Sequence, residues 1–351
     1  MDGPERLEVG RPPRGGPTRW VLAAVVAVVL VVLLAVRVDG HGDGRTSPSP
    51  SPAPTGGPVA ADRAWASEAG PGPGTLYVVA GRAVLAVDGA TGAVTRTGVG
   101  TEIDVRLTAA RTGVLVWYPD GRPARLLNRA ADVGHPLTGA LVGADAFLPG
   151  PKPLVWAAQV DRAVSRPTTA WRLVDEDGSV LERVEVRGRA VADGAGGVLA
   201  VADGTVTPAF PRAARRTPEP GAVVATGRDG FVVQRCSRDA CRSVLHTGPG
   251  AVGRPLAVPL ASSAVDGALS PDNRFVLVTQ LVGDAPVVQV RPLRSARPRR
   301  TFPGGGTGAV WLSERQVAFL GRQGLVLYDA VDDVVVPTAL GDVTRIAWQS
   351  A

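Results

Sequence analysis

Short apolar runs follow one another every 8 to 12 residues from residue 75 to the end of the chain, and a marker run of one kind recurs about every 40 residues. Each marker run follows a corner of small or turn-forming residues and leads directly into a second run. No segment in this part has a helical period, so the rhythm predicts an all-β domain built from repeated units. The marker runs begin near Thr75, Gly113, Leu154, Val198, Phe231, Phe275 and Val317.

The clearest corner lies between Gly267 and Val278, with the sequence G-A-L-S-P-D-N-R-F-V-L-V. Pro271 fixes the backbone for the first position of a turn, and Asp272 and Asn273 tolerate the second. A second clear stretch, V-L-A-V-D-G-A-T-G-A-V-T-R from Val84 to Arg96, reads as a hairpin with an acidic, glycine-containing turn.

These stretches resemble the repeats of WD40-like, YVTN-like and TolB-like β-propeller proteins, and the hairpin resembles the D-x-x-T-G hairpin of quinoprotein-type repeats. The resemblance covers the domain as a rhythm, but only residues 75–100 and 265–336 as motifs. No unit combines the Gly-His and Trp-Asp pairs of a standard WD40 repeat. A period of about 40 residues is that of a four-stranded blade.

The resemblance therefore implies a seven-bladed β-propeller over residues 75–351. Six or eight blades remain alternatives, because the unit from 198 to 230 is short. The last apolar segment, Val343 to Trp348, is expected to precede the strand at Thr75 and to close the ring within the first blade. Such closure removes the exposed edges of an open array of strands.

The chain before the repeats divides into three parts. Residues 20–38 begin with seventeen uncharged residues, enough for a helix that crosses a bilayer core of about 30 Å. Residues 1–19 are polar and rich in Pro and Gly, which predicts a disordered tail, and three arginines upstream of the helix predict that this tail is cytoplasmic. Residues 39–74 form a Pro/Ser/Gly-rich linker. Cleavage as a signal peptide stays open, although Ala35-Val36-Arg37 matches a cleavage site poorly and favours an uncleaved anchor.

Composition and charge restrict the partners only loosely. The chain has 44 Gly and 31 Pro but one Met, and arginine supplies nearly all of its positive charge. This bias resembles that of GC-rich, actinobacterial genomes, so the resemblance is to propellers of the membrane-anchored actinobacterial type. Residues 1–74 hold 7 arginines and 7 acidic residues, so the net charge of +6 belongs to the repeat domain. A basic surface permits binding to anionic polymers or lipid headgroups.

Two cysteines, Cys236 and Cys241, flank a four-residue loop between two apolar runs. A hairpin places them opposite each other, within reach of a disulfide. An exported domain would also lie in an oxidising compartment, where disulfides persist. Two free thiols are the alternative. A metal site is not expected, because the two cysteines and His246 do not complete a tetrahedral set.

Two clusters of arginine fall at predicted turns between strands. They are candidates for a patch that binds an anionic cell-envelope polymer or an acidic partner, and the alternative is a solvated turn in an arginine-rich chain. Nucleic acid is not expected outside the membrane. The first cluster is Arg291, Arg294, Arg297, Arg299 and Arg300, and the second is Arg212, Arg215 and Arg216.

The residues typical of catalysis are sparse. The chain has three histidines, His41, His135 and His246, and no Gly-x-Ser-x-Gly elbow, so no catalytic, cofactor-binding or metal-binding residue is expected. The acidic stretch 175–177 is interpreted as a solvated turn rather than a Ca²⁺ site, and glycines 304–306 lack the lysine of a phosphate loop. Five tryptophans are interpreted as packing residues rather than a sugar platform: Trp117, Trp156, Trp171, Trp311 and Trp348.

The expected function is a membrane-tethered, extracytoplasmic binding or scaffolding module for a cell-envelope partner, without catalysis. Because propellers carry many functions on loops of one face, this step is an analogy. One alternative is an envelope hydrolase or lactonase with its site in the central channel, which a cluster of Asp, Glu or His there would favour. Another is a sensor domain whose short N-terminal tail reports inside the cell.

Overall fold

The computed structural model describes residues 62–350 apart from residues 101–104, 111–112, 120–121, 123, 129–134, 138, 142–143, 145, 152–153, 160–167, 176, 211–217, 238–239, 248–251, 257–266, 283–284, 296, 305–306 and 323. The predicted cytoplasmic tail, the predicted transmembrane helix at 20–38 and the linker up to residue 61 lie outside these residues. Within the described part, no helix has the length and apolar character needed to span a membrane.

The described residues form 28 strands and two short 3-10 helices, η1 (Ser67–Ala69) and η2 (Gly139–Leu141). Five sheets have four strands each, and a sixth has eight. The first sheet has the order β28 (Val343–Ser350), β1 (Gly74–Ala80), β2 (Ala83–Asp88), β3 (Val94–Gly100). The second has the order β4 (Arg106–Ala109), β5 (Gly113–Trp117), β6 (Arg125–Asn128), β7 (His135–Pro136).

The third and fourth sheets repeat this simple antiparallel order. The third contains β8 (Ala146–Pro149), β9 (Val155–Ala158), β10 (Thr168–Val174) and β11 (Val180–Arg187). The fourth contains β12 (Arg189–Ala192), β13 (Val198–Ala202), β14 (Thr205–Phe210) and β15 (Glu219–Pro220). The last sheet along the chain contains β24 (Thr307–Trp311), β25 (Gln316–Gly321), β26 (Gly324–Asp329) and β27 (Val334–Val336).

The eight-stranded sheet consists of two such four-stranded units joined side by side. One unit is β16 (Ala222–Gly227), β17 (Gly230–Cys236), β18 (Cys241–Thr247) and β19 (Arg254–Pro255). The other is β20 (Gly267–Leu269), β21 (Phe275–Val282), β22 (Ala285–Pro292) and β23 (Arg300–Pro303). The first strands, β16 and β20, join them by a parallel pairing of only two residue pairs.

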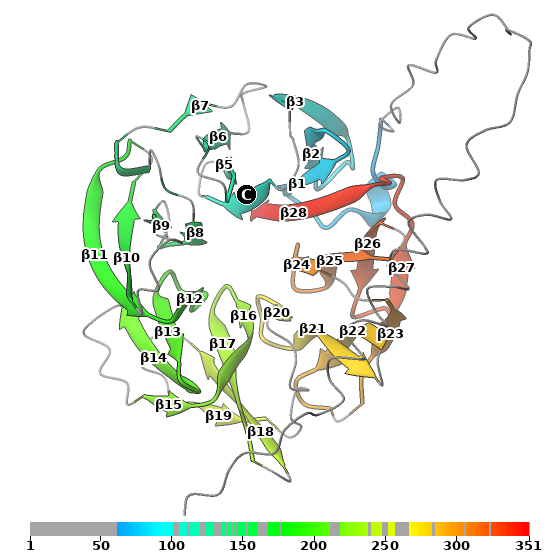
Figure 1. Cartoon of the computed structure of the whole chain (residues 1–351). Helices are drawn as coiled ribbons and strands as arrows, with labels where there is room; N and C mark the ends of the chain where they lie inside the picture. Colours follow the sequence, from blue (N-terminus) through cyan, green and yellow to red (C-terminus); the bar gives the residue numbers. More distant parts are fainter. Residues whose placement is uncertain are drawn as a thin grey trace, which may run out of the picture. The chain divides into compact units, whose positions relative to one another are not determined.

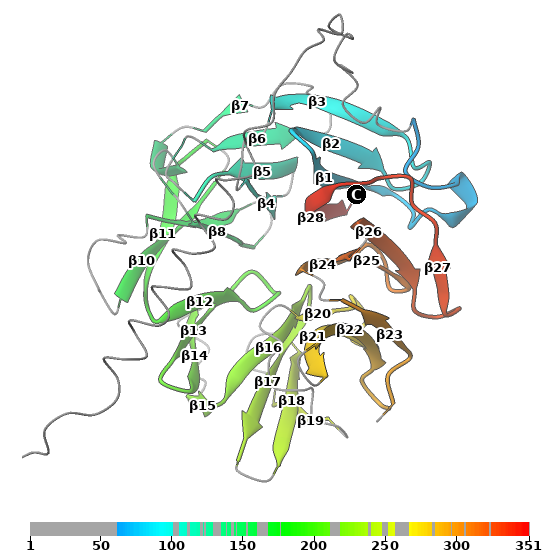
Figure 2. The ribbon, with the colours of Figure 1, turned by 45° about the vertical axis from the view of Figure 1, so that its right-hand side comes forward.

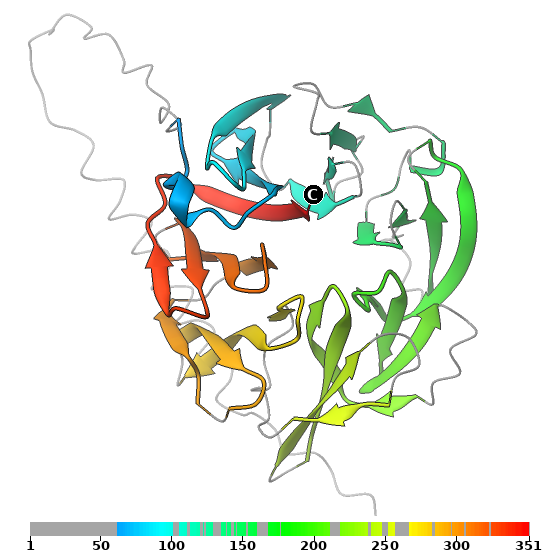
Figure 3. The same ribbon diagram turned by 180° about the vertical axis from the view of Figure 1, so that it is seen from behind.

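The sheets are arranged radially around a common centre, which is the arrangement of a β-propeller (Figures 1, 2 and 3). The innermost strands are β28, β4, β8, β12, β16, β20 and β24. Strand β28 contacts β4 on one side and β24 on the other. The described buried apolar residues form seven clusters, one between each pair of consecutive four-stranded units. Side chains that alternate along each strand therefore fill the spaces on both faces of every sheet.

The seven predicted apolar runs are confirmed as strands, and each is the second strand of its unit. They correspond to β1, β5, β9, β13, β17, β21 and β25. The predicted closure is also confirmed, because C-terminal β28 pairs antiparallel with β1 from Gly74↔Ser350 onward. The first and last sheets share one apolar cluster, in which Leu76 contacts the same core as Leu327.

The corner between β20 and β21 shows why its sequence suits a turn. The backbone N–H of Asn273 donates to the carbonyl of Ser270 at 2.9 Å, and Asn273 has a φ of +54°, a conformation that asparagine adopts readily. The Ser270 hydroxyl is buried and accepts the backbone N–H groups of Arg274 and Phe275 at 3.1 and 3.0 Å. Asp193 plays the same part in the corner after β12, where its Oδ1 accepts two backbone N–H groups.

Tryptophans contribute to packing between units, as predicted. Trp156 and Trp171 are buried in the cluster between the third and fourth sheets. The indole N–H of Trp311 donates 2.9 Å across to the carbonyl of Ala268 in the neighbouring unit. Trp117 and Trp348 are half-buried. Trp117 packs against the cluster between the second and third sheets, and Trp348 packs against the cluster between the first and last sheets.

Residues 62–69 pack on the first and last sheets and differ from the expectation of a spacer up to residue 74. Ala64 and Trp65 are buried in the cluster that joins these sheets. Ala64 donates to the carbonyl of Gly92 at 2.7 Å and accepts from Ala339 N–H at 2.9 Å. Two buried side chains and these backbone hydrogen bonds attach the stretch to the domain.

Candidate functional site

The arginine-rich turn between β22 and β23, residues 291–300, is named the basic turn here. Leu293 fixes it to the core, because this side chain is buried in the cluster between β16–β19 and β20–β23. The backbone N–H of Leu293 donates to the carbonyl of Arg274 at 2.8 Å. The backbone N–H of Arg299 donates to the carbonyl of Val290 at 2.8 Å. Both ends of the basic turn are therefore held by hydrogen bonds.

Two of the five predicted patch residues bind the neighbouring sheet. The Arg299 guanidinium donates to the carbonyl of Val331 at 2.6 Å. Arg300 Nη1 lies 3.4 Å from Asp333 Oδ1, with both side chains partly exposed. Val331 and Asp333 belong to the turn between β26 and β27, residues 329–333, named the acidic turn here. The basic turn of one unit is thus attached to the acidic turn of the next.

The acidic turn is ordered by its own side chains. Asp329 Oδ1 accepts the backbone N–H groups of Val331 and Asp332, each at 2.9 Å, and Asp88 plays the same part for Thr91 between β2 and β3. The Arg315 guanidinium donates to Oδ2 of Asp329 at 2.9 Å and also contacts Asp332. The hydrogen bonds that Arg315 donates to Asp329 and then to Asp332 raise the pKa of Arg315.

Asp333 receives a hydrogen bond from the Tyr328 hydroxyl at 2.8 Å. This bond, followed by the charge of Arg300, lowers the pKa of Asp333. Burial, together with the bond to Asp333, raises the pKa of Tyr328 above its usual value. The carboxylate of Asp333 is therefore kept ionised, and it is available to hold Arg300 in place.

The other three predicted patch residues lie in two different environments. Arg291 is half-buried at the end of β22, and burial lowers the pKa of its guanidinium. Arg294 and Arg297 are exposed, and among the described residues neither has an acidic partner. Ser295 braces this part of the turn, because its hydroxyl accepts the Arg297 N–H at 3.2 Å. The second predicted cluster, at Arg212, Arg215 and Arg216, lies outside the described residues.

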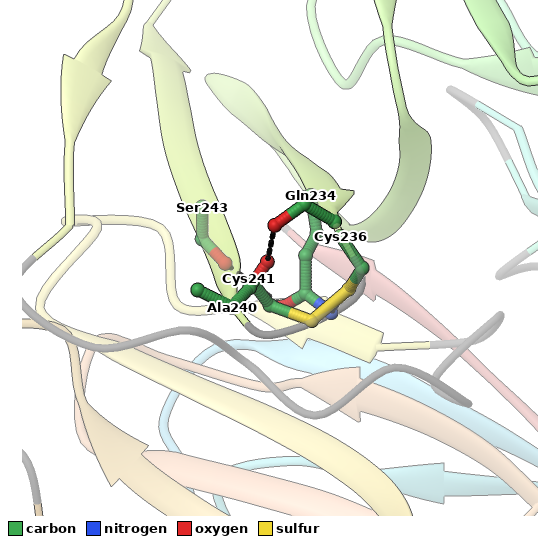
Figure 4. The surroundings of a disulfide bond; sticks show 6 residues. Gln234, Cys236, Ala240, Cys241 and Ser243 are labelled. Atoms are coloured by element: carbon green, nitrogen blue, oxygen red, sulfur yellow. Dashed lines mark hydrogen bonds between the residues drawn. A yellow bond between two sulfur atoms is a disulfide. The ribbon is translucent and has the colours of Figure 1, made fainter.

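The predicted disulfide is confirmed between Cys236 and Cys241, whose α-carbons are 4.0 Å apart at the end of the β17–β18 hairpin (Figure 4). Beside it, the Ser243 hydroxyl donates to Gln234 Oε1 at 2.9 Å on the buried face of the hairpin. Both described thiols are consumed in this bond.

One contact was not predicted from the sequence. His246 on β18 is 8% exposed, stacks on Phe231 with ring centroids 4.9 Å apart, and places Nε2 2.8 Å from Glu219 Oε2 on β15. These residues are 27 positions apart and belong to different sheets, so no local spacing indicates the pair. His41 lies outside the described residues, and only the backbone of His135 is described.

The innermost strands determine which side chains border the centre of the ring. As described, these seven strands contain no Asp, Glu or His, and their ionisable residues are Arg106, Arg189 and Arg345. In the described part of the chain, no three His, Cys, Asp or Glu residues are grouped as metal ligands would be. The acidic stretch that contains Asp175 and Asp177 uses its own carboxylates locally, because both accept the backbone N–H of Ser179.

No protein-family model matches the chain, and no curated protein matches its sequence. Solved structures do share its fold. A functionally unknown protein from Desulfotomaculum acetoxidans is 12% identical, and the match covers 80% of this chain and 99% of that protein with a TM-score of 0.52. This likeness shows the fold alone.

Two further bacterial structures match with lower TM-scores. TolB from Acinetobacter baumannii is 9% identical over 78% of this chain and 66% of TolB, with a TM-score of 0.45. A proposed 6-phosphogluconolactonase from Bacteroides fragilis is 10% identical over 78% of this chain and 97% of that protein, with a TM-score of 0.44. The radial sheets, closed by the pairing of β28 with β1, give this chain a β-propeller fold (Figure 1).

Proposed function

We propose that this protein is a seven-bladed β-propeller, held outside the membrane by residues 20–38, that binds an anionic cell-envelope partner through the basic turn. The blade count follows from treating the eight-stranded sheet as two blades. Its two halves share only two residue pairs, and an apolar cluster lies between them as between all other units.

The observation that carries the binding role is the contrast within the basic turn. Arg299 and Arg300 are used to attach the turn to the neighbouring unit, whereas Arg294 and Arg297 remain exposed on the same backbone. A turn that is already ordered loses little conformational entropy when it binds. Two guanidinium groups on such a turn suit the singly charged carboxylates of an acidic polymer, each of which can bind one guanidinium through paired hydrogen bonds.

The proposed location rests on a different observation. The Cys236–Cys241 bond closes a short loop whose first cysteine is exposed, and disulfides of this kind persist in oxidising compartments. This supports a domain that is exported beyond residue 38. The membrane-anchored, actinobacterial type of propeller is the family type that we propose on the composition of the chain.

The test uses the full chain in an uncharged detergent and polyglutamate as the anionic probe. The double variant R294Q/R297Q is compared with wild type and with R82Q/R254Q, which removes two exposed arginines elsewhere, one in the β1–β2 turn and one on β19. We expect R294Q/R297Q to weaken binding several-fold and the control to bind as wild type does. Wild-type binding should decrease as salt rises from 0.05 to 0.5 M, because salt screens exposed charges. Equal binding by all three proteins contradicts the role of the basic turn.

A further inference from the structure

Two arginines lie directly opposite each other near the tip of the β17–β18 hairpin. The register pairs Arg235 with Arg242, and both are exposed, with no acidic partner among the described residues. Like charges at directly opposite positions of an antiparallel pair destabilise it. Folding of the hairpin therefore gains nothing from this pair, here named the arginine pair.

The neighbouring residue pair fixes the geometry of the arginine pair. Cys236 and Cys241 are the next pair in the register and are joined by the disulfide. Gln234 and Ser243 form the preceding pair, and their side chains hydrogen-bond at 2.9 Å on the buried face. The two arginine side chains therefore extend from directly opposite backbone positions that the disulfide holds in place. In such pairs the β-carbons are about 5 Å apart.

The arginine pair is separate from the basic turn. Strands β16 and β20 are parallel, and each pairs antiparallel with the next strand of its unit, so β17 and β21 run in the same direction. The arginine pair lies where β17 ends, whereas the basic turn lies where β22 ends, at the opposite end of the strands. Figures 1 and 2 show the β17–β18 hairpin projecting outward from the ring.

We propose that the arginine pair is a second binding site, which holds one dianionic phosphate group such as a phosphomonoester. A phosphomonoester carries a charge of about −1.5 to −2 at neutral pH and has three acceptor oxygens. Two guanidinium groups, each with a planar set of donors, match both that charge and those acceptors. A carboxylate, with a single charge, neutralises only one of the two arginines.

Phosphorus NMR of phenyl phosphate, titrated with the full chain in uncharged detergent, tests the proposal. We expect line broadening with wild type and competition by inorganic phosphate but not by benzoate. Each single variant, R235Q or R242Q, should weaken binding roughly threefold, and R235Q/R242Q should abolish the broadening. Lowering the pH to 5 should weaken binding, since the phosphate becomes a monoanion.

The controls separate this site from the basic turn and identify the source of the phosphate. R82Q/R254Q and R294Q/R297Q should both bind phenyl phosphate as wild type does. Binding to phosphatidylcholine vesicles that contain phosphatidic acid would assign the phosphate to a lipid headgroup, and its absence would assign it to a soluble or polymeric phosphate. Unchanged broadening in the folded R235Q/R242Q variant, or competition by benzoate equal to that by phosphate, would overturn the proposal.

Discussion

Arg300 Nη1 lies 3.4 Å from Asp333 Oδ1, and this contact links the basic turn of one unit to the acidic turn of the next. Part of the positive charge of the basic turn is therefore used within the protein. Buried Leu293 and the backbone hydrogen bonds at Leu293 and Arg299 hold the rest of the turn, so Arg294 and Arg297 are presented on an ordered backbone.

Removing the charge of Asp333 should destabilise the fold in a pH-dependent way. The pKa of Asp333 lies below its ordinary value of 3.8, and such a group stabilises the folded state above the unfolded-state pKa and loses this effect as the pH falls through the folded pKa. We expect D333N to lower the Tm at pH 7. The difference from wild type should begin to shrink near pH 3.8 and disappear at lower pH.

Asparagine is the suitable replacement because Asp333 has a φ of +60°, which asparagine tolerates. Thermal melts between pH 2.5 and 7 provide the measurement. The Y328F variant serves as a companion, since loss of the Tyr328 hydroxyl should move the pKa of Asp333 back toward 3.8. A constant Tm difference between wild type and D333N at all pH values would refute the assigned role.

The corner serine Ser270 should contribute more to stability than its counterpart Ser313. Ser270 is 1% exposed, and its hydroxyl accepts two backbone N–H groups, so S270A should lower the free energy of unfolding by about 1–3 kcal/mol. Ser313 is only half-buried, although its hydroxyl also accepts two backbone N–H groups. Urea unfolding of both variants checks this. An S313A loss equal to or larger than that of S270A would argue against burial as the cause.

Trp65 should be essential for the packing of residues 62–69. This side chain is 4% exposed within the cluster between the first and last sheets, and replacing a buried tryptophan with alanine typically costs about 3–5 kcal/mol. We expect W65A to lower the free energy of unfolding by this amount, measured by urea unfolding, and A66S, at an exposed neighbour, to change it little. Unchanged stability of W65A would mean that this stretch is a spacer.

The C-terminal strand should be required for a folded domain. Residues Gly74 to Ala80 of β1 pair along their length with β28, so deleting residues 342–351 would expose β1 as an open edge and open the apolar cluster shared with the last sheet. Limited proteolysis should show a resistant domain in wild type, and in a variant lacking only Ala351, but not in the truncated chain. A truncated chain that stays resistant would show that the ring does not depend on this closure.

The sequence predicted the fold well where the signal was local and repeated. All seven second strands, the closure by β28 and the disulfide agree with expectation, because apolar alternation, turn residues and cysteine spacing are local features. The packing of residues 62–69 was not predicted, because Trp65 gives one apolar signal without a period. The pairs Arg300–Asp333 and His246–Glu219 join different sheets, and no spacing along the chain indicates such contacts.

The sequence predicted the candidate site only as a group of arginines that lie close together along the chain. Five arginines within ten positions suggested one patch, but the structure gives them different tasks. Arg291 is half-buried, Arg299 and Arg300 hold the neighbouring unit, and Arg294 and Arg297 are exposed. This division depends on the acidic turn of the next unit, which approaches the basic turn only in the folded ring.

Hydrogen–deuterium exchange of the full chain, with and without polyglutamate, tests the central claim most directly. Our account predicts that the probe slows exchange in peptides covering residues 291–300, and that R294Q/R297Q removes this protection while R82Q/R254Q retains it. Protection confined to the innermost strands, with none at residues 291–300, would contradict it.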